Sequence, residues 1–597
     1  MRQVNALPIA SQSADGSSWT WKHVALGAAG VVLVGVSSYG IYSYFFKPDG
    51  TVSKGKKGRG GKSSTPKNLT EVNSDISTTK TALESAVEAK MRGNKYFKGK
   101  MYSKAVECYQ EALALSGAES SLKGGDTTQG GDLGGGEKLA SAERATFYHN
   151  LAAAYEKMEK PEDVVRECSN CLKISPKYIK ALSKRAKAYK SLGELEYAIQ
   201  DITAAALLED LANAENMQLS EVITKELSEK KAKEKYASKT SRPSPSKHFV
   251  KGYFDSFTFS IFDCETPSED ADTSKGFLKA KKLFEEGDDF EGVESACSYE
   301  IDRVGEDSPF YINALLVRGT FRLLSGAAKL ALEDLEKVVN SPKSSAHQKS
   351  NALIKRGSLH MQNQENFRAM ADFEQSVEVA DESVDAHHHR GQLFLLMEDN
   401  ERCIDEFNKC IKLDPSFYQP AIQLCYANYK VAATQRDLIK ANRALEEFKD
   451  ILKKFPKSSD GHAMYAQALA DAGQPTESLA MFDKAIALCT ENAANYVHKG
   501  MLLLQLKGDY NAAIDLIKQS IEKDPRSDFA YEMMGNIEIK RGDYSAAAKA
   551  FEKSIDNARF EVEMERMYFL YLSASSWKYV KDNYGIDVST IIGKAMQ

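Results

Sequence analysis

Small and aromatic residues recur at matching places in successive segments of about 34 residues. Within one segment a glycine or alanine comes first, followed by an aromatic residue, an alanine, a second aromatic residue and a final alanine. Residues 86–119 show this order, and their members are Gly93, Tyr96, Ala105, Tyr109 and Ala112. The spacing places apolar residues on one face of each of two helices, so the pattern predicts pairs of antiparallel helices.

The same register returns along most of the chain. Further segments start at residues 145, 179, 350, 384, 459, 493 and 528, and weaker copies cover 275–310, 312–345 and 418–456. A helix pair of this length and pattern is typical of a tetratricopeptide repeat, which buries its apolar face only by stacking on its neighbours. The predicted fold class is therefore an all-α tetratricopeptide-repeat superhelix of about eleven repeats in two domains.

Changes in composition predict the domain boundaries. The expected parts are a tail at 1–22, a transmembrane anchor at 23–46, a basic flexible linker at 47–80, a repeat domain at 81–227, a charged helix end and linker at 228–275, a second repeat domain at 276–585 and a tail at 586–597. Residues 118–140 are rich in glycine and lack a P-loop lysine, so a flexible loop is predicted there and a phosphate site is not.

The predicted anchor at 23–46 carries no Asp, Glu, Lys or Arg and is long enough to cross a bilayer once. Basic residues are far more frequent between 47 and 67 than before the span, so the positive-inside rule leaves the bulk of the chain in the cytosol. A cleaved secretory signal is the alternative, but the apolar stretch is long for one. The segment suits a mitochondrial outer-membrane anchor with the N-terminus in the intermembrane space, and its pattern also allows the endoplasmic reticulum.

Composition and motifs favour a binding protein over an enzyme. The net charge of −5 argues against a nucleic-acid partner, and nine scattered cysteines argue against a disulfide scaffold. Cys168 and Cys171, like Cys403 and Cys410, fall at packing positions of their repeats. The consecutive His387–His389 point in different directions on a helix and cannot converge on one metal. Neither a metal, a cofactor nor a catalytic residue is therefore predicted.

The first helices of the N-terminal repeats carry a candidate binding site. Its members are Lys90, Asn94, Asn150, Lys180 and Lys184, at repeat positions that line the concave wall. Lys90 and Asn94 are four residues apart, as are Lys180 and Lys184, so each pair shares a helix face. Ammonium groups donate charge-assisted hydrogen bonds to carboxylates, and asparagine amides can bind carboxylate and peptide backbone together. The predicted ligand is a peptide that ends in a free carboxylate beside an Asp side chain.

This pattern resembles the dicarboxylate clamp of co-chaperones that hold the C-terminal Glu-Glu-Val-Asp tails of the heat-shock seventy and ninety chaperones. The resemblance implies chaperones of both classes as partners. In such clamps the last residue is usually arginine, whereas this chain has Lys184 followed by Arg185. Either residue is therefore a candidate to complete the site.

The chain as a whole resembles the seventy-kilodalton tetratricopeptide import receptors of the mitochondrial outer-membrane translocase. The motifs that carry the resemblance are RGNKYF (92–97), PSPSKHFVKGYFDSF (243–257), NYVHKG (495–500) and FAYEMMGNIEIKRGDY (529–544). The resemblance implies an import receptor that takes precursors from chaperones and passes them to the translocation pore, with other translocase subunits and membrane lipid as partners. The alternative is a membrane-anchored scaffold or co-chaperone that organises a signalling complex on another organelle.

The resemblance also implies that the C-terminal repeats bind hydrophobic precursors, notably inner-membrane metabolite carriers. Methionines among scattered polar groups on the inner helices would give an adaptable apolar surface, although the same residues could simply pack inside the superhelix. The candidate groove residues are His389, Gln392, Met464, Gln467, His498, Met501, Met533 and Asn536.

Overall fold

The computed structural model describes residues 82–121, 135–239, 242, 245–263, 273–287 and 289–595. The predicted anchor at 23–46, its flanking segments and most of the glycine-rich loop lie outside these ranges. None of the helices within them is both long enough and apolar enough to cross a bilayer.

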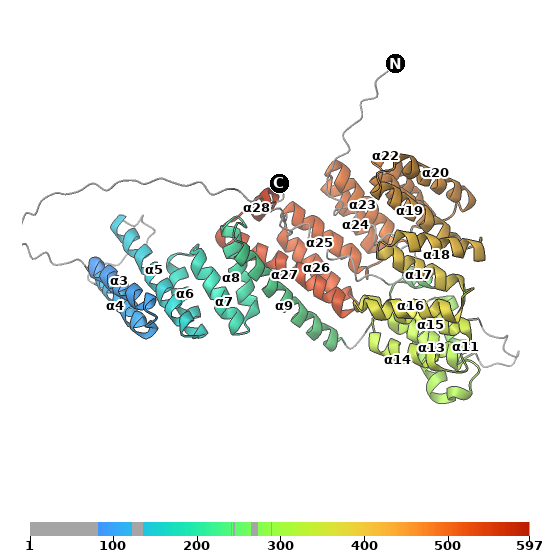
Figure 1. The fold of residues 1–597 in the computed structure, drawn as a ribbon, viewed down its shortest axis with the longest axis horizontal. Helices are drawn as coiled ribbons and strands as arrows, with labels where there is room; N and C mark the ends of the chain where they lie inside the picture. Colours follow the sequence, from blue (N-terminus) through green and yellow to red (C-terminus); the bar gives the residue numbers. More distant parts are fainter. Residues whose placement is uncertain are drawn as a thin grey trace, which may run out of the picture. The chain divides into compact units, whose positions relative to one another are not determined.

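Regular structure in the described part of the chain is entirely helical, which confirms the predicted all-α repeat fold. The chain divides into two compact units, and the described residues up to Leu227 form the first unit together with those from Ser575 onward. The pairs of the first unit are α3 (Ala82–Lys98) with α4 (Tyr102–Ser121), α5 (Gly135–Lys157) with α6 (Pro161–Ile174), and α7 (Ile179–Ser191) with α8 (Leu195–Leu208). Successive pairs are stacked side by side (Figure 1).

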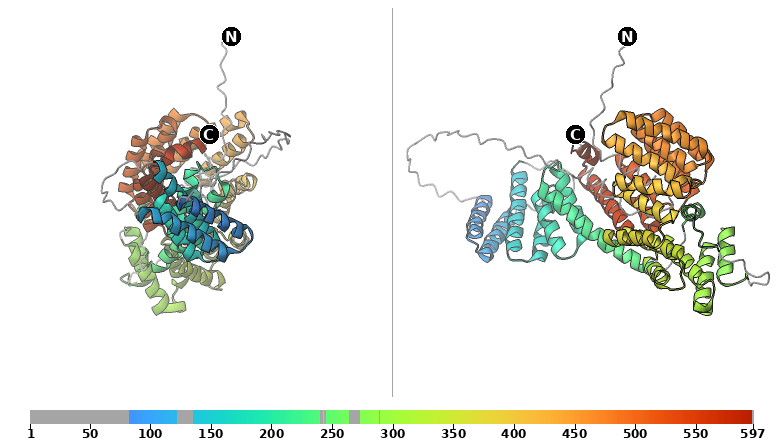
Figure 2. Two further views of the ribbon diagram at one scale, coloured as in Figure 1. Left: turned by 90° about the vertical axis from the view of Figure 1, so that its left-hand side faces the viewer. Right: turned by 45° about the vertical axis from the view of Figure 1, so that its right-hand side comes forward.

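The second unit is Ser228–Ala574 and continues the same scheme. Its pairs are α11 (Gly276–Glu286) with α12 (Phe290–Tyr299), α13 (Tyr311–Leu324) with α14 (Ala328–Asn340), α15 (Ala346–Gln362) with α16 (Asn366–Val379), α17 (Val384–Leu396) with α18 (Asn400–Leu413), α19 (Tyr418–Thr434) with α20 (Leu438–Lys454), α21 (Ser459–Asp471) with α22 (Pro475–Leu488), α23 (Ala493–Lys507) with α24 (Tyr510–Lys523), and α25 (Asp528–Arg541) with α26 (Tyr544–Asn557). The further views show these pairs stacked in chain order (Figure 2).

Two long helices contain the boundaries between the units. The first boundary falls inside α9 (Ala214–Ser238) and the second inside α27 (Glu561–Tyr584). The segment predicted as a tail contains a further helix, α28 (Val588–Ala595), which belongs to the first unit. The stretch from 228 to 275 was predicted as a helix end and linker, yet it also holds α10 (Lys247–Phe254).

Helix α10 and the residues after it are part of the core of the second unit. Val250, Tyr253 and Phe262 are buried among the side chains of α11 and α13. The rings of Phe254 and Phe262 lie 4.6 and 4.3 Å from that of Phe284 on α11. Aromatic packing of this kind removes a large apolar area from water, so the segment stabilises the second unit.

A glycine on the first helix of a pair faces an aromatic ring on the second. A Cβ added at Gly535 would lie 2.5 Å from Cε1 of the buried Phe551, and one added at Gly391 would lie 2.7 Å from Cε1 of Phe407. No larger residue fits without moving the ring. The repeating glycine and aromatic positions seen in the sequence therefore set how closely the two helices approach.

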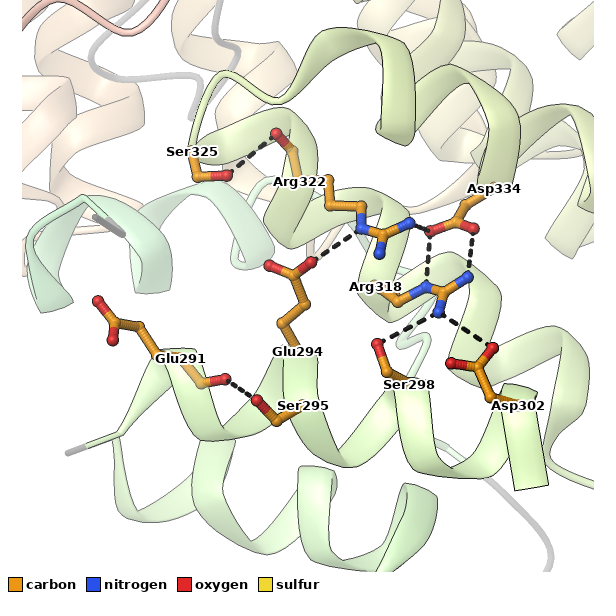
Figure 3. A network of polar contacts seen from close by, with 9 residues as sticks. All are labelled: Glu291, Glu294, Ser295, Ser298, Asp302, Arg318, Arg322, Ser325 and Asp334. Carbon is orange, nitrogen blue, oxygen red and sulfur yellow. Dashed lines mark hydrogen bonds and ion pairs between the residues drawn. The ribbon is translucent and has the colours of Figure 1, made fainter. Parts of the chain in front are cut away.

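An ion pair next to this contact joins the same two helices in several repeats. Arg318 donates to both carboxylate oxygens of the buried Asp334, at 2.9 and 2.7 Å, and Arg322 donates to the same carboxylate at 2.8 Å (Figure 3). Equivalent pairs, also 16 residues apart, are Arg185–Asp201, Arg356–Asp372 and Arg390–Glu406. Two parallel charge-assisted bonds fix the relative register of the helices as well as their distance.

We expect Gly535→Ala to destabilise the second unit. The added methyl group would gain about 1 kcal/mol of helix propensity. Forcing it against Phe551 costs about 1–3 kcal/mol, because the ring has no space to move into. The difference leaves up to about 2 kcal/mol of destabilisation, so the midpoint of thermal unfolding should fall, by up to a few degrees.

The matched control is Gly252→Ala in α10, where an added Cβ meets no other atom within 4 Å. This substitution should leave the unfolding midpoint unchanged or raise it slightly. A Gly535→Ala protein that unfolds at or above the temperature of the unaltered chain would contradict the steric account.

Candidate functional site

The N-terminal candidate residues lie on the first helices of three successive pairs. Lys90 and Asn94 are on α3, Asn150 is on α5, and Lys180 and Lys184 are on α7. Helix α5 contacts both α3 and α7 (Figure 1). We call these five residues the lysine–asparagine cluster.

The two asparagines of the cluster are in contact. The Asn150 amide donates to Oδ1 of Asn94 at 3.4 Å, and the Tyr109 hydroxyl from α4 donates to the same oxygen at 2.8 Å. Both asparagines are only half-buried. Oδ1 of Asn94 therefore accepts hydrogen bonds from within the protein, and its amide N–H groups remain to donate to a carboxylate or a peptide carbonyl.

Two of the three lysines of the cluster form ion pairs with carboxylates of the protein itself. Lys90 donates to Glu143 on α5 at 2.6 Å, with its ammonium also 5.5 Å from the centroid of the Phe147 ring. Lys184 is paired with Glu156 on the same neighbouring helix. Lys180 is exposed and forms no ion pair with another described residue. Without a ligand, the cluster therefore already binds two carboxylates, those of Glu143 and Glu156.

A histidine that the sequence analysis did not single out lies beside the cluster. The ring of His149 is half-buried, 5.2 Å from that of Tyr178. Burial, together with the nearby charges of Lys184 and Lys180, lowers the pKa of His149 to about 4. One signal could have identified it, because His149 occupies the same repeat position as Lys90 in the preceding repeat.

Arg185 points away from the cluster. Its guanidinium donates to both oxygens of the buried Asp201 on α8, at 2.6 and 2.7 Å, and to the Ser169 hydroxyl at 3.0 Å. Burial alone would lower the pKa of Arg185, but the bonds to Asp201 outweigh it and raise the pKa. The sequence could not choose between Lys184 and Arg185; in the structure Lys184 pairs with Glu156 on α5 and lies near enough to His149 to lower its pKa.

The eight candidate groove residues of the second unit lie mostly inside the packed repeats. All except Met501 and Asn536 are buried. Met464 packs in the core around α19–α21, and Met533 packs with residues of α23–α25. In the chain as described, a ligand could reach these buried side chains only after neighbouring groups move.

The buried histidines of this set have specific neighbours. His389 lies 3.1 Å from Gln392, and its ring is 4.3 Å from that of Phe257, in the segment that follows α10. His498 lies near the rings of Phe482 and Phe529, and burial lowers its pKa to about 4. The helix positions were predicted from repeat periodicity, which carries no information about the segment that covers His389.

The paired cysteines are packing residues. Cys168 and Cys171 are fully buried on α6, and burial raises the pKa of each thiol to about 12. A protonated thiol is a poor nucleophile and a poor metal ligand. Among the described residues there is no group of His, Cys, Asp and Glu side chains placed to hold a metal ion.

Comparison with known proteins agrees with the repeat architecture. The family description "Tetratricopeptide repeat" matches residues 384–417, 436–493 and 501–562. The chain is 38% identical to the mitochondrial import receptor subunit TOM70 of Homo sapiens over 525 residues, which are 85% of this chain and 82% of the human protein. It is 22% identical to the subunit of that name from Saccharomyces cerevisiae over 529 residues, 79% of this chain and 77% of the yeast protein.

Among solved structures, the crystal structure of the yeast Tom70 covers 86% of this chain and 99% of that chain, with a TM-score of 0.45 and 22% sequence identity. The human relative is similar over most of the length of both chains, which confirms the predicted family. The chain belongs to the TOM70 family of mitochondrial outer-membrane import receptors, which are built from tetratricopeptide repeats and are not enzymes.

Proposed function

We propose that this receptor docks heat-shock seventy and ninety class chaperones through their acidic C-terminal tails, which bind at the lysine–asparagine cluster. It then receives hydrophobic precursors, such as inner-membrane metabolite carriers, in its C-terminal repeats and passes them to the translocation pore. Residues 23–46 anchor it by a single span, with the N-terminus in the intermembrane space and the repeats in the cytosol.

The observation that supports this proposal most is that three lysines and two asparagines lie on three successive first helices, which contact one another in turn, with the two asparagines hydrogen-bonded. Ammonium groups donate hydrogen bonds to carboxylates. Asparagine amides can donate to a carboxylate or to a peptide carbonyl, so the two residue types together suit a ligand with two carboxylates and a peptide backbone. Glu143 and Glu156, which pair with Lys90 and Lys184, occupy the places that ligand carboxylates would take. Docking would therefore exchange internal ion pairs for intermolecular ones, while Lys180 is already available.

The proposal that the second unit binds precursors is supported by fewer observations. Met501 and Asn536 are the half-buried members of the predicted groove, and the Asn536 amide nitrogen has no hydrogen-bond partner among the described residues. Both lie on first helices, α23 and α25, which contact each other. We propose this part of the unit as the first contact of a precursor, with the buried members becoming exposed as the repeats adjust.

We expect Lys184→Ala to weaken binding of a peptide that ends in Glu-Glu-Val-Asp by about tenfold or more, since a bond to a charged group contributes about 1.5–3 kcal/mol. Asn94→Ala should weaken it at least as much, because Asn94 would contact both the carboxylate and the backbone. Amidation of the peptide's C-terminus should weaken binding to the unaltered chain in the same way. Calorimetric titration at fixed ionic strength measures all three effects.

The matched control is Lys187→Ala, which removes an exposed lysine from the same helix that pairs with Glu215 instead. Its affinity should equal that of the unaltered chain. If the amidated peptide binds as well as the free acid, the cluster is not a carboxylate clamp.

The pKa of His149 should report the binding of a peptide at the lysine–asparagine cluster. Its pKa is held at about 4 by burial and by two lysine charges. Ligand carboxylates that bind Lys180 and Lys184 would offset those charges, so the pKa of His149 should rise when the peptide binds. A nuclear magnetic resonance titration of labelled histidines, with His149→Gln to assign the signal, measures the pKa with and without peptide.

An unchanged His149 pKa at saturating peptide would place the ligand away from α7. The signal of His462, which lies in the second unit, serves as the reference and should titrate identically in both samples.

A further inference from the structure

The second unit contains a cavity of about 760 Å³. It is lined by α10 and the segment after it, by α11 and α15, and by the start of α19. A cavity of this size is within the range of small-molecule sites. It includes none of the eight predicted groove residues and shares no residue with the lysine–asparagine cluster, which belongs to the other unit.

Aromatic side chains form much of the wall. The rings of Phe254, Phe262 and Phe284 pack against one another at centroid distances of 4.3–5.7 Å. Phe257 and Phe417 add further apolar surface. The rim carries charges of both signs, Lys247 and Lys251 against Asp255, Glu285 and Asp414, so it selects neither anions nor cations strongly. Discrimination by charge therefore depends on the buried floor.

The floor holds two polar side chains from one face of α15. Lys355 and Asn351 are four residues apart and are 1% and 2% exposed, respectively. Nδ2 of Asn351, a donor, has no hydrogen-bond partner among the described residues, and neither do two acceptors, Oδ1 of Asn351 and Oε1 of Gln419 on α19. Buried polar groups are normally satisfied. The unpaired donor Nδ2, on the same helix face as Lys355, therefore indicates a missing acceptor, whereas the two oxygens would need a donor such as water.

Lys355 makes no ion pair with another described residue. Its ammonium lies 5.0 and 5.9 Å from the ring centroids of Phe257 and Phe254. The nearby Asp385 carboxylate accepts hydrogen bonds from the Thr258 backbone, the Thr258 hydroxyl and the Phe259 backbone, at 2.6, 2.7 and 2.9 Å. Those bonds hold Asp385 to the segment after α10 and leave Lys355 without a carboxylate of its own.

An unpaired buried amine is costly to the fold. Burial lowers the pKa of Lys355 to about 7, and Asp385 offsets this only in part. A methionine of similar length would fill the same space without that cost. Groups that reduce stability in this way are characteristic of binding sites, where a ligand supplies the missing partner.

We propose that this cavity is a binding site for a small monocarboxylate with an aromatic or otherwise apolar body. Lys355 is the one buried lysine of the described lining, so its single charge matches a carboxylate better than a doubly charged phosphate ester. The Asn351 amide and the Lys355 ammonium offer donors to the carboxylate oxygens, and the phenylalanine rings pack against the apolar body. A cationic ligand is excluded by Lys355. This activity is separate from the docking and precursor binding proposed above.

The test is calorimetric titration of the full chain in lipid nanodiscs, with empty nanodiscs subtracted, using phenylbutanoate and the matching alcohol phenylbutanol. The acid should bind more tightly than the alcohol by about tenfold or more, because only the acid pairs with Lys355. Lys355→Met should abolish this preference and raise the temperature of thermal unfolding. The matched control Lys337→Met removes an exposed lysine from α14, outside the cavity, and should change neither quantity.

Equal affinity of the acid and the alcohol for the unaltered chain overturns the proposal. This comparison uses no variant, so it does not depend on whether Lys355→Met folds. Retention of the acid preference in Lys355→Met overturns it as well, as does its loss in Lys337→Met. Absence of binding by either compound at millimolar concentration also counts against the site.

Discussion

The close approach of two helices within each repeat is the contact on which the rest of the molecule depends. It is made where a glycine such as Gly391 or Gly535 lets an aromatic ring of the second helix lie directly on the backbone of the first. Because the partners are always 16 residues apart, the neighbouring arginine and aspartate positions face each other too, as Arg318 and Asp334 do. In the repeats that carry both contacts, steric fit and charge pairing fix the same register, so their first helices are presented in the same way.

This register determines where the side chains of the first helices lie. In the first unit it brings Asn94 and Asn150 into contact and places Lys184 beside a carboxylate on the neighbouring helix. In the second unit the same stacking buries His389 and Met533. The open polar surface of one unit and the closed interior of the other therefore follow from one architecture, and the differences come from which side chains occupy equivalent positions and which segments cover them.

Much of the fold and of the first site could be predicted from the sequence, because repeat position determines both the helix and the face on which a residue lies. Arg185 could not be assigned in this way, because its position on α7 alone does not reveal its partner Asp201 on α8. The segment around Phe257 follows no repeat pattern, so its packing against His389 was not predictable. For the same reason the cavity above Lys355 could not be found, because that segment forms one of its walls.

The central claim is that the lysine–asparagine cluster exchanges its own carboxylates for those of a ligand. A crystal structure of the chain with a peptide ending in Glu-Glu-Val-Asp tests this most directly. The account predicts the terminal carboxylate within hydrogen-bond distance of Asn94 and Asn150, with Lys90 and Lys184 released from Glu143 and Glu156. A bound peptide that leaves both ion pairs intact, or that lies elsewhere on the repeats, would contradict it.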